Sequence, residues 1–327
     1  GSLYHAALLG LPLIPEVARI VPENAPDGLA RRPCLSDPIF RNLEGESLKD
    51  AALRHWAGGS GCYSLGDGNA LSLTDHNLCQ SPDCLAGFQA YLEDGYGELS
   101  ALNAAWGSSF RSWEAVRPSD LTVARTSGRL APYIDFRRYM ERVFTEFHVF
   151  ARERIRETDR GAIAGLRLLP EDQPLYGYHY GELARRLDFL ALEADPVNTA
   201  WLRGWESPGK TSLLVADSVL VEEDTLRARW LPWHAVLNGL DGVWVTRTFG
   251  DAGNAAARAA LRPDGQPSPS FASMGEAWRQ IGDGLGALLL RADREPAPVA
   301  VFHSPASRHF NDADPVAGLS SRLSETA

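Results

Sequence analysis

Short apolar runs alternate along this chain with longer amphipathic stretches. The apolar runs predict six strands, at about residues 11–18, 61–66, 162–168, 187–193, 211–216 and 242–247. A helical period predicts the helices between them, at residues 46–57, 85–94, 98–104 and 133–157. Strands that alternate with helices in this way are typical of a parallel sheet covered by helices. The pattern therefore predicts an α/β fold.

The longest predicted helix has one apolar face. Tyr139, Val143, Phe147, Phe150 and Ile155 follow one another at helical intervals, which places them on a common stripe. Leu85, Phe88, Tyr91 and Leu92 make a similar stripe on an earlier helix. Packing against a core explains both stripes.

Length and charge narrow the class of protein. A chain of 327 residues is long for a single ordinary domain but normal for an α/β barrel. The formal net charge of −10 argues against a nucleic-acid partner, because a phosphate-binding surface needs clustered cations. The chain contains no run of eighteen apolar residues, so no membrane partner is expected either.

A joint pattern after the second predicted strand is more specific than periodicity. Tyr96-Gly97, Leu102-Asn103 and Trp106-Gly107 follow one another at spacings that helix packing does not require, and Phe110 comes next. This segment resembles the one after strand four in family 42 glycoside hydrolases, the bacterial β-galactosidases. The resemblance extends over roughly residues 10–310.

Other segments resemble the same family in matching order. Arg31–Phe40 is similar to the cysteine-containing loop after strand three, and Asp188–Glu193 to the sixth strand with its leading aspartate. Trp233–Arg247 resembles the helix and strand that close the barrel, and Leu261–Pro267 the turn that follows.

The resemblance implies a (β/α)8 TIM-type barrel. Six strands are too few for closure, so we expect that the first strands precede Gly1 and that the chain is an internal piece of a bacterial protein. The barrel domain is expected over residues 1–295. Residues 296–327 are expected to begin the next domain, because Pro298–Ser307 resembles its first strand. That domain carries trimer contacts in the family, so a homotrimer is expected of a full-length parent. Any signal peptide would lie upstream of Gly1, so the sequence indicates neither a cytoplasmic nor an exported protein.

In such a barrel the chemistry lies at the carboxyl ends of the strands. Hydrolysis with retention uses two carboxyl groups about 5 Å apart, one as acid/base and one as nucleophile. In the family both are glutamates. Here Asp67 matches the first member of the strand-four pair, but Gly68 stands at the acid/base position. Asp67 either substitutes as the acid or is a hydrogen-bonded structural carboxylate.

Asp217 follows the fifth predicted strand of this chain and is the candidate nucleophile. The alternatives are capping of the next segment or pairing with an arginine, while Glu222 and Glu223 are read as a solvated loop. The resemblance thus implies a retaining double displacement on a β-galactoside or related glycoside. A catalytically silent barrel that binds carbohydrate or serves as a scaffold is the competing reading, and Gly68 favours it.

Further polar and aromatic residues near strand ends are candidates for contact with a carbohydrate substrate. Flat rings stack on sugars, although a tryptophan in a barrel also serves as ordinary core and His179 equally fits a surface position. The candidates are Asn69, Tyr178, His179, Glu193, Trp205, Trp244 and Arg247.

Three cysteines match positions where the family has a structural zinc. Cys34, Cys79 and Cys84 would be ligands, and His76 or Asp75 would complete the four that zinc prefers. A disulfide and free thiols remain open alternatives. The reaction itself requires no cofactor. Cys62 lies inside a predicted strand and is expected to be a small buried residue.

The glycine-rich run Gly282–Gly286 lacks the preceding strand and following helix of a nucleotide site. No nucleophile elbow supports a serine triad.

Overall fold

The structure is a computed structural model of the chain. It describes residues 13–20, 22–24, 30–56, 61–73, 79–169, 173–205, 209–216, 224–245, 259–262, 264–289, 292 and 302–313. Within these ranges no helix combines the length and apolar character needed to cross a lipid bilayer.

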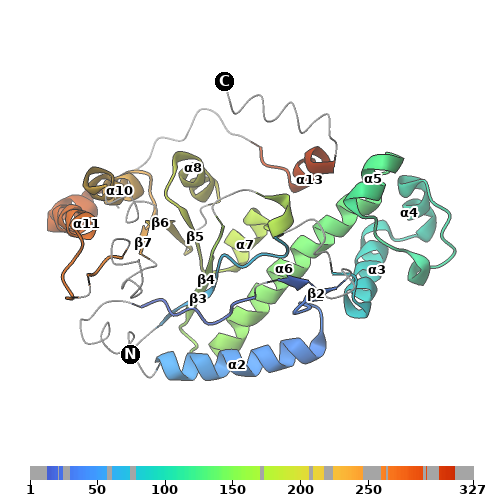
Figure 1. The fold of residues 1–327 in the computed structure, drawn as a ribbon, viewed down its shortest axis with the longest axis horizontal. Helices are drawn as coiled ribbons and strands as arrows, with labels where there is room; N and C mark the ends of the chain where they lie inside the picture. The colour runs from blue at the N-terminus through green and yellow to red at the C-terminus, as the bar shows by residue number, and fades with distance from the viewer. Residues whose placement is uncertain are drawn as a thin grey trace.

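A parallel sheet of five strands lies at the centre of the molecule (Figure 1). Its strands are β3 (Cys62–Asp67), β4 (Ile163–Arg167), β5 (Phe189–Glu193), β6 (Thr211–Val215) and β7 (Gly242–Trp244). Their spatial order is the order of the chain, and every neighbouring pair is parallel. The prediction of parallel strands separated by helices is therefore confirmed.

The segment before β3 extends the sheet by a single bridge. Glu16 and Ser64 form a parallel bridge, in which Val17 N donates to Ser64 O at 2.9 Å and Ser64 N donates to Pro15 O at 2.9 Å. The strand predicted over residues 11–18 thus occupies its expected place beside β3, although residues 11 and 12 lie outside the described ranges. A small antiparallel pair, β1 (Glu23–Asn24) with β2 (Arg31–Arg32), follows it.

Helices surround this sheet. They are α2 (Pro38–Trp56), α3 (Pro82–Tyr96), α4 (Leu99–Trp106), α5 (Leu121–Ser127), α6 (Ala131–Thr158), α7 (Tyr180–Arg186), α8 (Pro196–Gly204), α10 (Thr225–Leu237), α11 (Pro269–Gln280), α12 (Gly286–Leu289) and α13 (Pro305–Ala313). The described residues also form the 3-10 turns η1 (Trp113–Ala115) and η2 (Pro174–Tyr176) and the π-helical turn η4 (Ile281–Leu285).

The predicted helices are all present, and α2 begins well before residue 46. Its first turn is fixed by Asp37, whose Oδ1 accepts a hydrogen bond from Ile39 N at 2.8 Å. Pro38 suits the first helical position because it has no N–H to satisfy there. The apolar pattern alone starts later, so it predicted a start at residue 46 for a helix that begins at Pro38.

Helix α6 is 28 residues long and packs on α2, β3 and α3. Its predicted stripe is confirmed, with Tyr139, Val143, Phe147 and Ile155 buried and Phe150 half-buried. Phe88 of α3 meets Phe136 of α6 edge to face, with 4.9 Å between the ring centroids. The two stripes read from the sequence therefore form one core.

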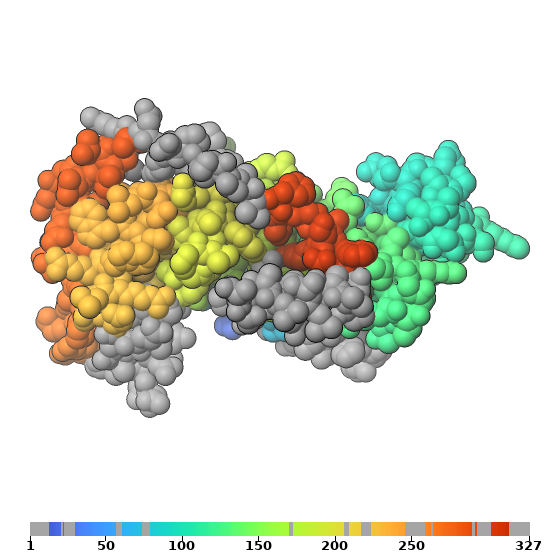
Figure 2. Space-filling model, turned by 90° about the horizontal axis from the view of Figure 1, so that it is seen from above, coloured from blue at the N-terminus to red at the C-terminus, as the bar shows by residue number. Residues whose placement is uncertain are grey.

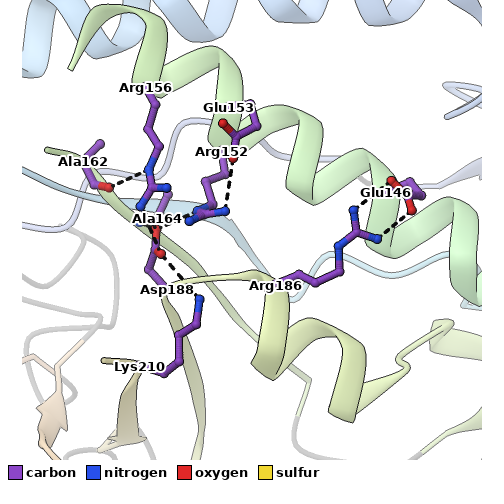
Figure 3. A network of polar contacts seen from close by, with 9 residues as sticks. All are labelled: Glu146, Arg152, Glu153, Arg156, Ala162, Ala164, Arg186, Asp188 and Lys210. Carbon is purple, nitrogen blue, oxygen red and sulfur yellow. Dashed lines mark hydrogen bonds and ion pairs between the residues drawn. The ribbon is translucent and has the colours of Figure 1, made fainter. Parts of the chain in front are cut away.

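Asp188 ties the amino-terminal end of β5 to α6 (Figure 3). Its Oδ2 accepts from Arg152 Nε at 3.0 Å, from Arg156 Nη2 at 3.0 Å and from the backbone N of Ala164 at 3.0 Å. Lys210 Nζ lies 3.8 Å from Asp188 Oδ1. Three cations and one β4 amide thus converge on the aspartate that precedes the strand, at the end opposite to the expected chemistry.

The described sheet does not close on itself. Within the described residues, the strand pairing of β7 is with β6 and that of residues 13–20 is with β3. Helices α3, α4 and α5 lie to one side of the sheet, and α13 lies between them and α8 (Figures 1 and 2). The arrangement is an open part of an α/β barrel.

One predicted strand is corrected here. Residues 302–304 have no regular structure and Pro305 begins α13, so the strand expected over Pro298–Ser307 does not include its last three residues. Proline followed by Ala306 and Ser307 starts a helix that packs on α6. Residues 298–301 lie outside the described ranges, as does the expected domain boundary near residue 295.

Candidate active site at the carboxyl edge of the sheet

Three neighbouring strands end in charged residues that contact one another. Arg167, at the end of β4, donates from Nη1 to Asp67 Oδ1 of β3 at 2.6 Å. Its Nη2 lies 3.6 Å from Glu193 Oε2 at the end of β5. Parallel strands bring their carboxyl ends to one edge, so this constellation follows from the topology. Asp67 and Glu193 lie where the sequence analysis placed them, and one guanidinium bridges them.

Glu16 adds another carboxylate to this edge. Its Oε1 accepts from the backbone N of Asp67 at 3.4 Å. The sequence analysis singled out neither Glu16 nor Arg167. Arg167 could have been found, because it directly follows the apolar run of β4. Glu16 gave no such signal, because it lies inside the strand predicted over residues 11–18 and not after it.

The backbone after Asp67 requires glycine. Gly68 has a φ of +71°, and a Cβ built there would lie 2.9 Å from Leu169 Cδ2. Gly66, just before Asp67, has a φ of +143°, and a Cβ there would overlap the side-chain amide of Asn69. A left-handed φ and close packing both disfavour a larger residue. Gly68 is thus a conformational requirement of this chain, and a glutamate there would be strained.

Asn69 lies in the core behind this edge and is only 1% exposed. Its Oδ1 accepts from Ile20 N at 3.0 Å, and its Nδ2 lies 3.0 Å from Ala18 O and 2.8 Å from Leu65 O. The amide therefore ties the segment of residues 13–20 to the end of β3. The protein's own backbone thus occupies its polar atoms, and the predicted contact of Asn69 with a substrate stays a prediction.

Tyr178 is buried as well, and its hydroxyl donates to Asn69 O at 2.6 Å. Burial raises the pKa of this phenol above its usual range. His179, next along the chain, caps α7 by accepting from Glu182 N at 3.3 Å through Nδ1. Both residues thus support the loop after β4, and their predicted contact with a sugar stays a prediction.

The two predicted sugar platforms contact other aromatic rings. Trp205 stacks on Tyr180, with 4.7 Å between the ring centroids and 7° between the planes. Trp244 meets Phe189 edge to face at 5.8 Å. Both indoles are half-buried, so packing accounts for part of each ring.

Several predicted site residues lie outside the described ranges. They are Asp217, Arg247, His76, Asp75, Glu222 and Glu223. The described range before Asp217 ends at Ala216, whose N donates to Trp244 O at 3.0 Å. The residue directly before Asp217 therefore lies at the end of β6, next to β7.

Three thiols meet beside α3 and form what we call the thiol corner: Cys34, Cys79 and Cys84. Their sulfur atoms all lie within 4.8 Å of one another, and Cys34 Sγ is 3.7 Å from Cys84 Sγ. All are free thiols. Tetrahedral zinc with bonds of about 2.3 Å needs sulfurs about 3.8 Å apart. The spacing of the three sulfurs therefore fits a metal ion.

Hydrogen bonds and a nearby cation shape the thiol corner. Hydrogen bonds from Cys34 and Cys84 lower the pKa of the Cys79 thiol, which favours a thiolate. Ser81 Oγ lies 3.2 Å from Cys34 Sγ and 3.4 Å from Cys79 Sγ. Burial lowers the pKa of Arg31 to about 10, while the three nearby cysteines oppose that shift. Among the described residues the metal-ligating groups here are these thiols, and His76 lies outside those ranges.

Comparison with known proteins identifies the family. A profile of the family Glyco_hydro_42, described as Beta-galactosidase, matches residues 14–217, which is more than half of the 327 residues. The chain belongs to glycoside hydrolase family 42. The resemblance inferred from Tyr96–Gly107 and the surrounding segments is thereby confirmed. The matched range contains the thiol corner, the charged strand ends and Asp217.

A curated relative matches part of this chain. The Beta-galactosidase of Thermus thermophilus is 30% identical over 128 residues, which is 37% of this chain and 20% of that protein. The chain thus spans about a fifth of that curated relative's length.

Solved structures show the shared fold. A catalytic mutant of Gan42B, a GH42 beta-galactosidase from G. stearothermophilus, matches with a TM-score of 0.73 at 15% identity and covers 99% of this chain and 54% of that one. An exo-carrageenase GH42 from Bacteroides ovatus matches with a TM-score of 0.65 at 16% identity, over 84% of this chain and 43% of that one. The chain therefore has the α/β fold of the family's TIM-type barrels, and it spans about half of these structures.

Proposed function

We propose that this family 42 chain belongs to a retaining glycoside hydrolase that acts on a β-galactoside or a related glycoside. The observation that carries the proposal is the bridge of Arg167 to Asp67 and Glu193 at the carboxyl ends of three parallel strands. Barrel enzymes place substrate at this edge. The family match adds the class of reaction, since its description is Beta-galactosidase.

Asp217 is our candidate nucleophile. It follows Ala216 at the end of β6, next in the sheet after the strand that carries Glu193. Its carboxylate would attack the anomeric carbon, and the glycosidic oxygen would leave with a proton. Asp67 is the candidate for donating that proton, and a water molecule would then release the sugar. The candidates for binding the sugar remain Asn69, Tyr178, His179, Glu193, Trp205, Trp244 and Arg247.

A silent barrel is the second candidate function, and one observation favours it. Gly68 occupies the expected acid/base position, with a φ of +71° and a Cβ site 2.9 Å from Leu169 Cδ2. The chain is therefore built to carry no side chain there. Losing a positioned general acid costs on the order of 10²–10⁴-fold in rate. A barrel of this kind would bind carbohydrate or serve as a scaffold.

The thiol corner supports a proposed structural zinc. Cys34, Cys79 and Cys84 would hold the ion, and His76 is the candidate fourth ligand from the sequence. Such an ion would stabilise the loop before α2 and the start of α3 and would take no part in hydrolysis. The domain division near residue 295 remains a proposal. A trimeric assembly of a full-length parent is also a proposal, and light scattering, which measures the mass of the assembly, tests it.

One experiment separates the two functions. The chain is incubated with a nitrophenyl β-galactoside and with natural galactosides, and the anomer released first is followed by proton NMR. A retained β-anomer supports the hydrolase. Sugar binding by calorimetry without turnover supports the silent, carbohydrate-binding barrel. A chain that neither binds nor hydrolyses a galactoside excludes both the hydrolase and the carbohydrate-binding barrel, and leaves the scaffold.

A further inference from the structure

Two arginines bind the backbone on either side of Cys34, one of the three thiols of the thiol corner. Arg31 of β2 donates from Nη1 to Pro33 O at 2.5 Å, and Pro33 directly precedes Cys34. Arg41, in the first turn of α2, donates from Nε to Leu35 O at 2.6 Å, and Leu35 directly follows Cys34. The two guanidinium groups therefore hold the carbonyls that flank this cysteine. Figure 1 shows β2 and the start of α2 beside α3, from which another of the thiols comes.

Arg31 is a buried cation whose hydrogen-bond acceptors carry no charge. It is 1% exposed, and besides Pro33 it donates to Leu71 O at 2.7 Å and to Ala70 O at 3.0 Å. It forms no ion pair with a carboxylate of the described residues. Carbonyl oxygens satisfy the N–H bonds but leave the positive charge without a counter-ion, and a buried charge is costly unless it is paired.

Arg41 has a carboxylate in its neighbourhood, but another arginine binds that carboxylate. Arg186 donates to both oxygens of Glu146, at 2.6 Å and 3.1 Å. Arg41 itself makes no salt bridge within the described ranges. Its guanidinium lies over the ring of Phe150, 5.6 Å from the centroid, so the ring covers part of it. Like Arg31, it has no carboxylate bound to it.

Both guanidinium groups are coupled electrostatically to the thiol corner. Burial lowers the pKa of Arg31, and all three cysteines oppose that shift. Burial also lowers the pKa of Arg41, and Glu146, Tyr139 and then Cys34 and Cys84 oppose it. The thiols are thus the acidic groups that act on both arginines. Negative charge on the sulfurs and positive charge on the arginines stabilise each other more in such a buried region than in water.

Zinc at the thiol corner would be an anionic group beside these two cations. Zinc binds cysteine as the thiolate, so Zn²⁺ with three thiolates and a neutral imidazole carries one net negative charge. We propose that Arg31 and Arg41 are the counter-cations of the thiol corner and raise its affinity for zinc. This role rests on the structural zinc proposed above and is independent of hydrolysis at the strand edge.

Zinc affinity tests the role of the two charges. The chain is freed of metal with a chelator under reducing conditions and titrated with zinc against a chromophoric chelator of known affinity. Loss of a partner outside the ligand set typically costs roughly 10–100-fold in metal affinity, so we expect a loss of about tenfold or more from Arg31→Gln and from Arg41→Gln. Arg31→Lys and Arg41→Lys keep the charge and should keep most of the affinity. Arg54→Gln, at the exposed far end of α2, is the control and should bind zinc as tightly as the unmodified chain.

The lysine variants separate charge from hydrogen bonding, and each arginine is judged by its own pair of variants. A purely structural role would lower the zinc affinity of the lysine and glutamine variants alike, and that result overturns the proposal. Glutamine variants that bind zinc as tightly as the unmodified chain overturn it too. Because Arg31 is fully buried, Arg31→Gln could fail to fold; the half-buried Arg41 then decides the question. If the unmodified chain binds no zinc, the proposed metal fails, and the role of both arginines fails with it.

Discussion

Asn69 Nδ2 lies 3.1 Å from His148 Nε2, inside the core between the end of β3 and α6. His148 Nδ1 lies 2.8 Å from Phe144 O and donates to it, so Nε2 accepts from the amide. The contact with the amide requires a neutral imidazole, because Nε2 can accept only when it carries no proton. The position of Asn69, directly behind the carboxyl edge of the sheet, therefore depends on a His148 that carries no charge.

This pair predicts a loss of stability in mild acid. Burial lowers the pKa of His148 from 6.5 to about 4, so between these values the unfolded chain binds a proton that the native chain does not. The free energy of unfolding should then fall as the pH falls from 6.5 to 4, by roughly 3 kcal/mol from this group. Denaturant unfolding across this range measures it. His148→Gln should reduce the dependence of the unfolding free energy on pH between 6.5 and 4. An unchanged dependence would refute the assignment of this loss of stability to His148.

The backbone conformation of Gly68 predicts that its substitution lowers stability. Gly68→Ala should cost at least about 1–2 kcal/mol of stability, because a left-handed φ strains any residue with a Cβ. Contact with Leu169 adds to that cost. Gly61→Ala is the matched control, since a Cβ there meets nothing within 4 Å. Equal unfolding free energies for the two variants would show that the φ of +71° at Gly68 imposes no strain.

Restoring the acid is expected to fail for the same reason. Gly68→Glu should lower stability and give no large gain with natural galactosides over aryl galactosides, whose leaving groups need no proton. A selective gain with natural galactosides would mean that the loop can rearrange and that the position is still catalytic.

The fold was predictable because it rests on local patterns. The apolar runs of β3 to β6 and the stripe on α6 are legible without any tertiary information. The start of α2 depends on a cap by Asp37 and Pro38, which periodicity does not detect. Pro305 likewise begins a helix where resemblance suggested a strand.

The site was predictable only in part. Asp67 and Glu193 end strands, so their place at the carboxyl edge follows from the topology. The roles of Asn69 and His148 depend on a contact between residues 79 positions apart, which no local pattern encodes. Arg167 was not predicted, because a pair of carboxylates in the sequence does not indicate which cation bridges them.

Arg167 itself should be needed for any activity at this edge. Arg167→Met removes the bridge between Asp67 and Glu193, and misplacement of catalytic groups by about 1 Å can cost on the order of 100-fold in rate. We expect a loss of that size in kcat/KM for a galactoside. Arg185→Met, at an exposed pair with Glu182, is the control. Full activity in both variants would remove the bridge from the mechanism.

The thiol corner predicts one metal ion per chain. Elemental analysis should find about one zinc per chain, and a chelator should lower the melting temperature. Cys84→Ser should lose the metal, whereas Cys62→Ser, in β3, should keep it. A chain with two free thiols after non-reducing purification, and no zinc, would instead indicate a disulfide.

The nucleophile can be identified by trapping it. A 2-deoxy-2-fluoro-β-galactosyl fluoride slows release of the sugar from a retaining enzyme, so the covalent intermediate accumulates. Mass spectrometry of the intact chain and of its peptides then locates the label. Asp217→Asn should abolish both labelling and turnover, whereas Asp94→Asn, on the exposed end of α3, should retain both. The account predicts one sugar per chain, attached to the peptide that contains Asp217; turnover without any label, or a label on another carboxylate, would contradict it.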